Sequence, residues 1–170
     1  SHEMSQSSSI SRELEPGDLV IGDRVFCSYA HLAILKKRGL HAVFRVHQKQ
    51  IIDFTPGRPQ AKRGSKDLPG LPRSRWVLAQ GDFDQIVIWY KPKSQPSWMT
   101  GEEYEELPGE LKLRELRYRV EVPGYRVSEI TRVTTMLTAG TSTEESLAEL
   151  FARGWPVRVD SGDLRIRRNK

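Results

Sequence analysis

The sequence lacks several features that define common classes of protein. Its single cysteine, Cys27, excludes an internal disulfide and a cysteine-rich zinc site. No glycine-rich loop of the phosphate-cradling type is present, which disfavours a nucleotide hydrolase. No apolar run approaches the roughly 18 residues that a membrane-spanning helix needs, and residues 1–16 lack the apolar core of a signal peptide. We therefore expect a soluble, cytoplasmic protein that has no membrane partner.

The histidines and the charged residues narrow the chemistry further. The four histidines have no spacing typical of a zinc site, so we interpret them as surface or packing residues. Lysine and arginine together number 27 against 22 acidic residues, which gives a formal net charge of +5. A basic chain favours an anionic partner such as nucleic acid, although many soluble domains are mildly basic. The cations gather in four stretches, at residues 36–38, 58–75, 114–132 and 165–170.

Residues 17–47 predict a strand, an acidic turn, a helix and a second strand. Residues 19–21 form a short apolar run, which is followed by a glycine and then by Asp23. Residues 28–38 place apolar side chains among polar ones and finish with three cations before a glycine, which is typical of a helix end. Residues 42–46 are again rich in strand formers. We expect a strand–helix–strand unit here.

The remainder of the chain predicts mainly antiparallel strands. We expect strands at residues 48–54, 76–79, 85–90, 111–122 and 125–137, and a further helix at residues 144–153. Residues 55–75 are rich in glycine, proline and cations, which predicts a long exposed loop. Residues 100–106 predict either one helical turn or a loop. In residues 111–122, apolar side chains alternate with charged ones, so we expect a half-buried strand whose polar face is rich in arginine.

These elements divide the chain into four segments. Residues 1–16 are rich in serine and predict a disordered leader. Residues 17–54 form a core segment, residues 55–137 a β-rich antiparallel insertion with a return hairpin, and residues 138–170 a helix with a basic tail. The first strand has the apolar character of an interior strand, yet no recognisable partner strand precedes it.

Asp23 is the sharpest candidate for a catalytic residue. A carboxylate at the end of a buried strand, directly after a glycine, can reach a metal ion without crowding from a neighbouring side chain. Two-metal phosphoryl transfer needs carboxylates in such places. An aspartate that follows a strand is more often a helix cap or a turn former, so both interpretations stay open at this point.

The stretch GDLVIGDRVFCSYAHLAILKKRGLHAVFRVHQ resembles the second conserved block of bacterial insertion-sequence DDE transposases, of the YREK-signature group with a β-rich insertion. Asp23 matches the second catalytic aspartate of that family. Arg24 and Phe26 match as well, whereas Val25 stands where a glycine is usual. The similarity covers residues 16–155. It implies an α/β fold in which a partial RNase H-like catalytic core is interrupted by an antiparallel β-rich insertion, with carboxylates that hold Mg²⁺ for DNA cleavage and strand transfer.

The chain departs from the family pattern at the other catalytic positions. The residues before Asp23 contain no equivalent of the first catalytic aspartate. The register of the last predicted helix places Arg158 where the catalytic glutamate belongs. Asp160 and Asp163 lie nearby in the sequence, and whether either replaces the glutamate stays open. We therefore expect weak or absent Mg²⁺ binding and a catalytically incomplete member of the family, because ligand charge and number set the affinity for hard cations.

Two functional hypotheses follow from these observations. In the first, the chain is a transposase-family protein of DNA transposition, which acts at insertion-sequence ends and pairs with further copies of itself or with a full-length transposase. In the second, it is a non-catalytic module that binds DNA or inhibits a transposase. In both, contacts to DNA phosphates would come from Lys36, Lys37, Arg38, Arg45, Arg63, Lys66, Arg117 and Arg119.

Overall fold

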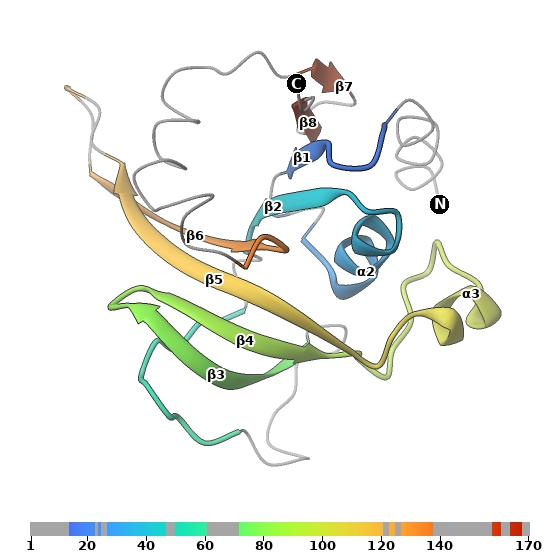
Figure 1. Ribbon diagram of the computed structural model, residues 1–170, viewed down its shortest axis with the longest axis horizontal. Helices are drawn as coiled ribbons and strands as arrows, with labels where there is room; N and C mark the ends of the chain where they lie inside the picture. The colour runs from blue at the N-terminus through green and yellow to red at the C-terminus, as the bar shows by residue number, and fades with distance from the viewer. Residues whose placement is uncertain are drawn as a thin grey trace.

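The computed structural model describes residues 14–22, 24, 27–46, 50–60, 72–120, 123–124, 127–137, 158–160 and 164–167. The strands of this part of the chain are β1 (Leu19–Gly22), β2 (His41–Arg45), β3 (Arg73–Gly81), β4 (Asp84–Tyr90), β5 (Glu110–Val120), β6 (Ser128–Thr134), β7 (Arg158–Asp160) and β8 (Leu164–Arg167). Its helices are α2 (Tyr29–Lys37) and α3 (Gly101–Glu106). The strands form one mixed sheet in the order β3-β4-β5-β6-β2-β1-β8-β7 (Figure 1). A mixed sheet with few helices is compatible with the predicted α/β class.

The strand–helix–strand unit predicted near the start of the chain is confirmed as β1, α2 and β2. The two strands are parallel, with Val20 opposite Ala42. The Ser28 hydroxyl caps α2 by accepting a hydrogen bond from the backbone N–H of His31 at 3.2 Å. Gly39 follows the helix with a φ of 73°, a left-handed conformation that a residue without a Cβ adopts at little cost. This turn allows the chain to reverse and to begin β2 beside β1.

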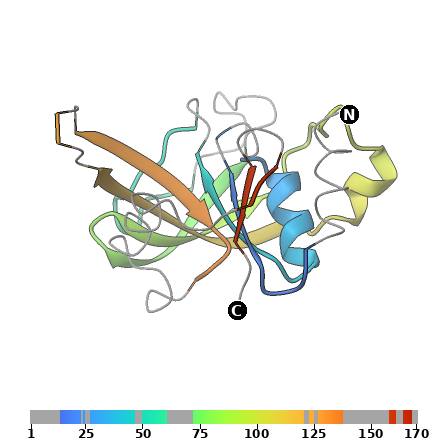
Figure 2. The ribbon, with the colours of Figure 1, turned by 90° about the horizontal axis from the view of Figure 1, so that it is seen from above.

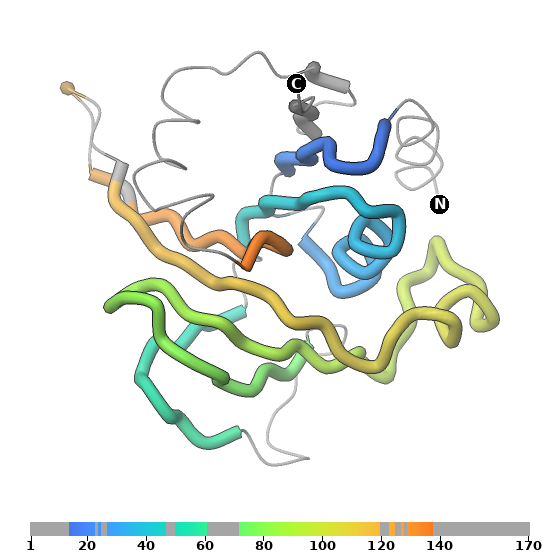
Figure 3. The backbone as a smooth tube through the Cα atoms, viewed as in Figure 1, coloured from blue at the N-terminus to red at the C-terminus, as the bar shows by residue number. Residues whose placement is uncertain are grey.

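The strands from β3 to β6 form an antiparallel meander (Figure 3). β6 then pairs with β2, with Val133 opposite Phe44, so the meander and the strand–helix–strand unit share one continuous sheet. β5 and β6 extend away from both helices as a long hairpin (Figures 1 and 2). The strands predicted at residues 76–79, 85–90, 111–122 and 125–137 are therefore confirmed, although their ends differ.

β1 is an interior strand, as its apolar sequence predicts. It lies between β2 and β8, and β8 is antiparallel to it, with Ile166 opposite Val20. β7 pairs with β8 and ends the sheet on this side. The second neighbour of β1 is therefore supplied by residues 164–167, from the segment that was predicted to hold a helix and a basic tail.

Both faces of the sheet bury apolar side chains. On the face that carries the two helices, which we call the helix face, Val87, Trp89 and Leu113 pack in one cluster with Leu32 of α2 and Tyr104 of α3. On the opposite face, which we call the second face, a smaller cluster is formed by Leu19, Ile21, Val43, Leu116 and Tyr118. A strand that is buried on both faces cannot alternate simply between core and solvent. The central strand β5 is such a strand.

The predicted polar face of β5 is wrong for the middle of the strand. Arg114 and Glu115 are both fully buried, whereas Arg119 near the end of the strand is exposed. The apolar pattern changes phase here, because Leu113 belongs to the cluster on the helix face and Leu116 to the cluster on the second face. The two charged residues between them therefore lie inside the molecule.

The strand predicted at residues 48–54 is not found over the described residues 50–54, whose backbone is irregular. Ile52 is nevertheless buried in the core. β2 pairs with β1 on one side and with β6 on the other. It therefore has no unpaired edge to which residues 50–54 could add as a neighbouring strand. The backbone carbonyl of Asp53 instead accepts a hydrogen bond from the side-chain amide of Gln85 at 3.1 Å.

The helical alternative for residues 100–106 is confirmed by α3. Thr100 and Glu103 form a reciprocal capping box at its start, which satisfies two backbone N–H groups. The described residues 55–60 of the predicted loop are irregular and mostly exposed, and the following strand begins at residue 73, earlier than predicted. The helix predicted at residues 144–153 lies outside the described residues.

Candidate nucleic-acid interface

Three arginines from separate parts of the sequence meet at one surface hollow of about 310 Å³, which we call the arginine hollow. Arg24 follows β1, Arg45 ends β2, and Arg117 lies on β5. The other lining residues are Val46, Gln50, Ile51, Ile52, Glu129 and Thr131. The parallel arrangement of β1 and β2 brings the first two arginines to the same end of the sheet, because carboxyl ends of parallel strands lie at one edge.

Arg117 is held in a defined orientation. Its Nε donates a hydrogen bond to the Thr131 hydroxyl at 2.9 Å, and its guanidinium carbon lies 5.0 Å from the centroid of the Phe54 ring. Among the described residues, neither contact engages the two terminal nitrogens of the guanidinium. A planar fork that is fixed through its Nε and its face is suited to bidentate contact with an oxyanion.

The hollow also contains one carboxylate and one buried acceptor. Glu129 lies opposite Arg119 across β5 and β6, with 3.7 Å between its Oε1 and the arginine Nε, and both side chains are more than half exposed. The Oε1 atom of Gln50 is buried and accepts no hydrogen bond within the described part of the chain. With three arginines against one glutamate, the lining favours an anion that can also donate a hydrogen bond.

The structure separates the basic residues that were predicted to contact DNA. Arg45 and Arg117 line the arginine hollow. Arg119 lies beside the hollow, because it forms an ion pair with Glu129 of the lining. An exposed trio stands at the C-terminal end of α2, consisting of Lys36, Lys37 and Arg38. The backbone contacts of Gly39 with Gly17 place this trio near the start of β1, at the end of the sheet away from the hollow. The remaining two, Arg63 and Lys66, lie outside the described residues.

Asp23, the predicted catalytic and metal-binding residue, lies outside the described residues, as does Asp163. Asp160 lies in β7, where only its backbone is described. Across the described ranges, no three His, Cys, Asp or Glu side chains gather closely enough to hold a metal ion. The charged residues in the lining of the hollow are three arginines and one glutamate. This set suits an anion better than it suits Mg²⁺, which prefers several oxygen ligands.

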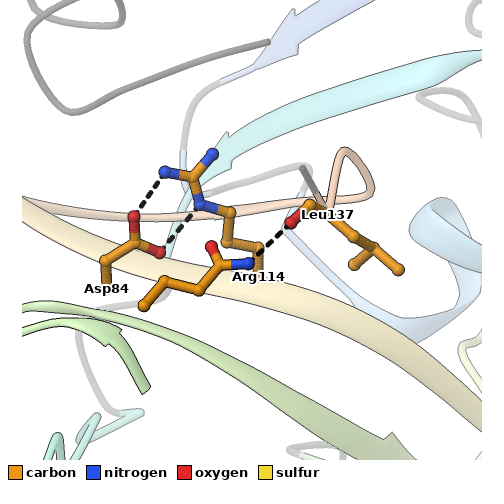
Figure 4. A network of polar contacts seen from close by, with 4 residues as sticks. Asp84, Arg114 and Leu137 are labelled. Atoms are coloured by element: carbon orange, nitrogen blue, oxygen red, sulfur yellow. Dashed lines mark hydrogen bonds and ion pairs between the residues drawn. The ribbon is translucent and has the colours of Figure 1, made fainter. Parts of the chain in front are cut away.

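A buried ion pair lies behind the hollow, on the second face of the sheet. Arg114 on β5 donates from its Nε to Oδ1 of Asp84 on β4 at 2.8 Å, and a second bond joins its Nη2 to Oδ2 (Figure 4). The Arg114 side chain is fully buried and that of Asp84 is 10% exposed. Nearby, the side chain of Gln80 donates to the backbone carbonyl of Leu137 at 3.0 Å. These contacts join the meander internally.

Glu115 faces the helix side of the same strand and is fully buried. Its two carboxylate oxygens accept hydrogen bonds from Nε2 of Gln85 at 2.9 Å and from Nε1 of Trp89 at 3.0 Å. Burial raises the pKa of Glu115, and these two hydrogen bonds oppose the rise. Since the same Gln85 amide also holds the carbonyl of Asp53, this network anchors the segment that lines one side of the arginine hollow.

Sequence reasoning missed both buried charged residues of β5. The available signal was the change of phase in the apolar pattern between Leu113 and Leu116, which places two charged residues between two buried leucines. The interpretation of the histidines as surface or packing residues is confirmed at His31, a packing residue whose burial lowers its pKa to about 4. Cys27 is a small buried residue of the core.

Comparisons with known proteins identify no relative, because no family model, no curated protein and no solved structure matches the chain. Within the described residues, neither helix combines the length and the apolar character that crossing a membrane requires.

Proposed function

We propose that this protein takes part in DNA transposition and binds DNA phosphates at the arginine hollow. The observation that carries the proposal is the convergence of Arg24, Arg45 and Arg117 at one end of the sheet. Guanidinium groups bind phosphate oxygens through paired hydrogen bonds that are assisted by charge. Three such groups around one hollow would fix the register of a DNA backbone without reading its sequence.

The buried acceptor of Gln50 supports a ligand that carries a hydrogen-bond donor as well as negative charge. A buried acceptor without a donor is costly, and binding a donor there would relieve that cost. A phosphodiester offers only acceptors, whereas the rest of a nucleotide adds donors on its base or at a free hydroxyl. A ligand that combines negative charge with a donor therefore fits the hollow best.

The transposase part of the proposal rests on the sequence resemblance around Asp23. An RNase H-like core would place this aspartate at the carboxyl end of β1, and Arg24 directly after it lines the hollow. We propose that this family origin explains the combination of a strand–helix–strand unit with a β-rich meander. The same proposal includes a catalytic role for Asp23 with Mg²⁺. It also includes a location in the cytoplasm, and pairing with further copies of the protein or with a full-length transposase.

The alternative is a non-catalytic module that occupies DNA or inhibits a transposase. The same three arginines favour it, because phosphate contacts alone provide binding without chemistry. A cleavage assay on insertion-sequence end DNA with Mg²⁺ or Mn²⁺ separates the two functions. Cleavage that is abolished in Asp23→Ala supports the enzyme. Binding without turnover supports the module.

The DNA contact itself is tested by fluorescence anisotropy with a labelled duplex at low and moderate salt. We expect the double variant Arg45→Ala/Arg117→Ala to weaken duplex binding by at least about tenfold, because each arginine removes a phosphate contact. Lys93→Ala is the matched control, since Lys93 is an exposed cation outside the hollow. The loss of binding free energy is compared per substituted residue. An equal loss per residue in the double variant and in Lys93→Ala would contradict a localised site.

A further inference from the structure

Beside the arginine hollow, the surface carries exposed apolar and aromatic side chains that phosphate binding does not use. Phe83, in the turn between β3 and β4, is 50% exposed, and Ile51 in the lining of the hollow is 91% exposed. Phe54 links this turn to the hollow, since its ring centroid lies 5.8 Å from that of Phe83 and 5.0 Å from the guanidinium carbon of Arg117. We call Phe83, Phe54, Arg117 and Ile51 the aromatic row.

The aromatic row is held by hydrogen bonds of the backbone. The backbone N–H of Arg117 donates to the carbonyl of Phe83 at 2.9 Å, which fixes the β3–β4 turn against β5. The carbonyl of Asp53, next to Phe54, accepts from the buried Gln85 amide. Both phenylalanines are therefore positioned by the framework before any ligand binds, which lowers the entropic cost of binding.

We propose that the aromatic row stacks the unpaired bases of a single DNA strand whose phosphates lie in the arginine hollow. This inference rests on the proposed function, because the hollow supplies the phosphate contacts. Aromatic rings and arginine planes beside a cationic groove are the combination that binds single strands, since every base offers a face for stacking. In a duplex, the base faces are already stacked on one another, so stacking on Phe83 adds little to the affinity for duplex DNA.

Charge complementarity favours a DNA strand over an apolar ligand at this surface, because the hollow beside the row carries three arginines. The strand order places Arg45 on β2 and Arg24 after β1, separated from the β3–β4 turn by β5 and β6. An anionic backbone can therefore follow the arginines while its bases turn toward the row. Ile51 gives a further apolar surface for a base or a sugar. The ligand class is therefore a single-stranded DNA with accessible bases.

The test compares binding of the full chain to a fluorescein-labelled oligothymidylate and to a duplex of the same length, by anisotropy in one buffer. We expect Phe83→Ala to weaken oligothymidylate binding by at least about fivefold, because alanine substitution of one stacking aromatic typically has this effect. Duplex binding should change by less than about twofold. Phe83→Tyr keeps an aromatic face and should bind as the unaltered protein does.

Leu78→Ala is the matched control. Leu78 is 42% exposed, and it is paired with Ile86, which lies on the second face of the sheet, away from the row. Equal losses in Phe83→Ala and Leu78→Ala, or equal losses for both DNA forms in Phe83→Ala, would overturn the stacking inference alone. If the unaltered chain binds neither DNA form, the stacking inference and the proposed function both fail.

Discussion

Arg114 and Arg117 lie three residues apart on β5, yet the protein uses them in opposite ways. Arg114 points to the second face, where it is fully buried and paired with Asp84. Arg117 points to the helix face near the end of the sheet, where it is partly exposed, lies over Phe54 and lines the arginine hollow. One arginine holds two strands together, and the other is oriented toward solvent.

The difference teaches that an arginine-rich stretch of sequence is not by itself a binding surface. Burial determines which cations are available to a ligand and which are committed to a fixed partner. A buried charge must keep its partner, because an unpaired ion inside a protein is strongly destabilising. A partly exposed arginine that is stacked and hydrogen-bonded through its Nε retains its terminal nitrogens for a ligand.

The largest effect is expected from breaking the buried pair. Arg114→Ala should lower the free energy of unfolding by about 3 to 5 kcal/mol, because it leaves Asp84 buried without its cation. Urea unfolding followed by circular dichroism measures the loss. Arg117→Ala is the comparison variant, and it should lose only about 1 kcal/mol, corresponding to one hydrogen bond and a partly exposed stacking contact.

A double variant sharpens the same comparison. Arg114→Met combined with Asp84→Leu removes both buried charges and should recover much of the stability lost in Arg114→Ala. If the double variant is as unstable as the sum of its two single variants, the two residues are not coupled, and the structural role assigned to the pair is wrong.

A smaller effect is expected from Glu115, which occupies the other face of β5 beside Arg114. Because burial raises its pKa in the folded state, the folded protein holds this proton more tightly than the unfolded chain. This contribution to stability is present below the usual glutamate pKa and is lost as the pH rises through the raised value. Unfolding free energies measured from weakly acidic to neutral pH should therefore include a decline that Glu115→Gln abolishes. Identical pH profiles for the two proteins would contradict a raised pKa.

Much of the fold could be predicted from the sequence, and the reasons are local. A capping serine, a cationic last turn and Gly39 define α2, and short apolar runs define β1 and β2. Alternation of apolar and charged residues identified β5, and runs of strand-forming residues identified the other strands of the meander. The pairing of β1 with β8 could not be predicted, because it joins residues that are far apart and few in number.

The candidate site could be predicted only in part. Arg45 and Arg117 were expected to contact DNA, but nothing local indicated that they meet at one hollow while residues 36–38 lie at the other end of the sheet. That grouping depends on strand order, which brings β6 between β5 and β2. Phe54 and Phe83 were also missed, since their contact crosses between a loop and a hairpin turn.

The smallest effect is expected from the cations at the end of α2. Lys37→Ala should change duplex affinity by less than about twofold, because an exposed charge far from the hollow acts only through a screened field. Anisotropy at physiological ionic strength measures it. A loss as large as that of Arg117→Ala would extend the DNA surface to this end of the sheet.

The salt dependence of duplex binding tests the central claim most directly. Each phosphate contact contributes a slope of about −0.9 to the plot of log affinity against log salt concentration. If Arg45 and Arg117 both bind phosphates, the double variant Arg45→Ala/Arg117→Ala should show a slope that is shallower by about two. An unchanged slope, with Lys93→Ala measured in parallel, would contradict DNA binding at the arginine hollow.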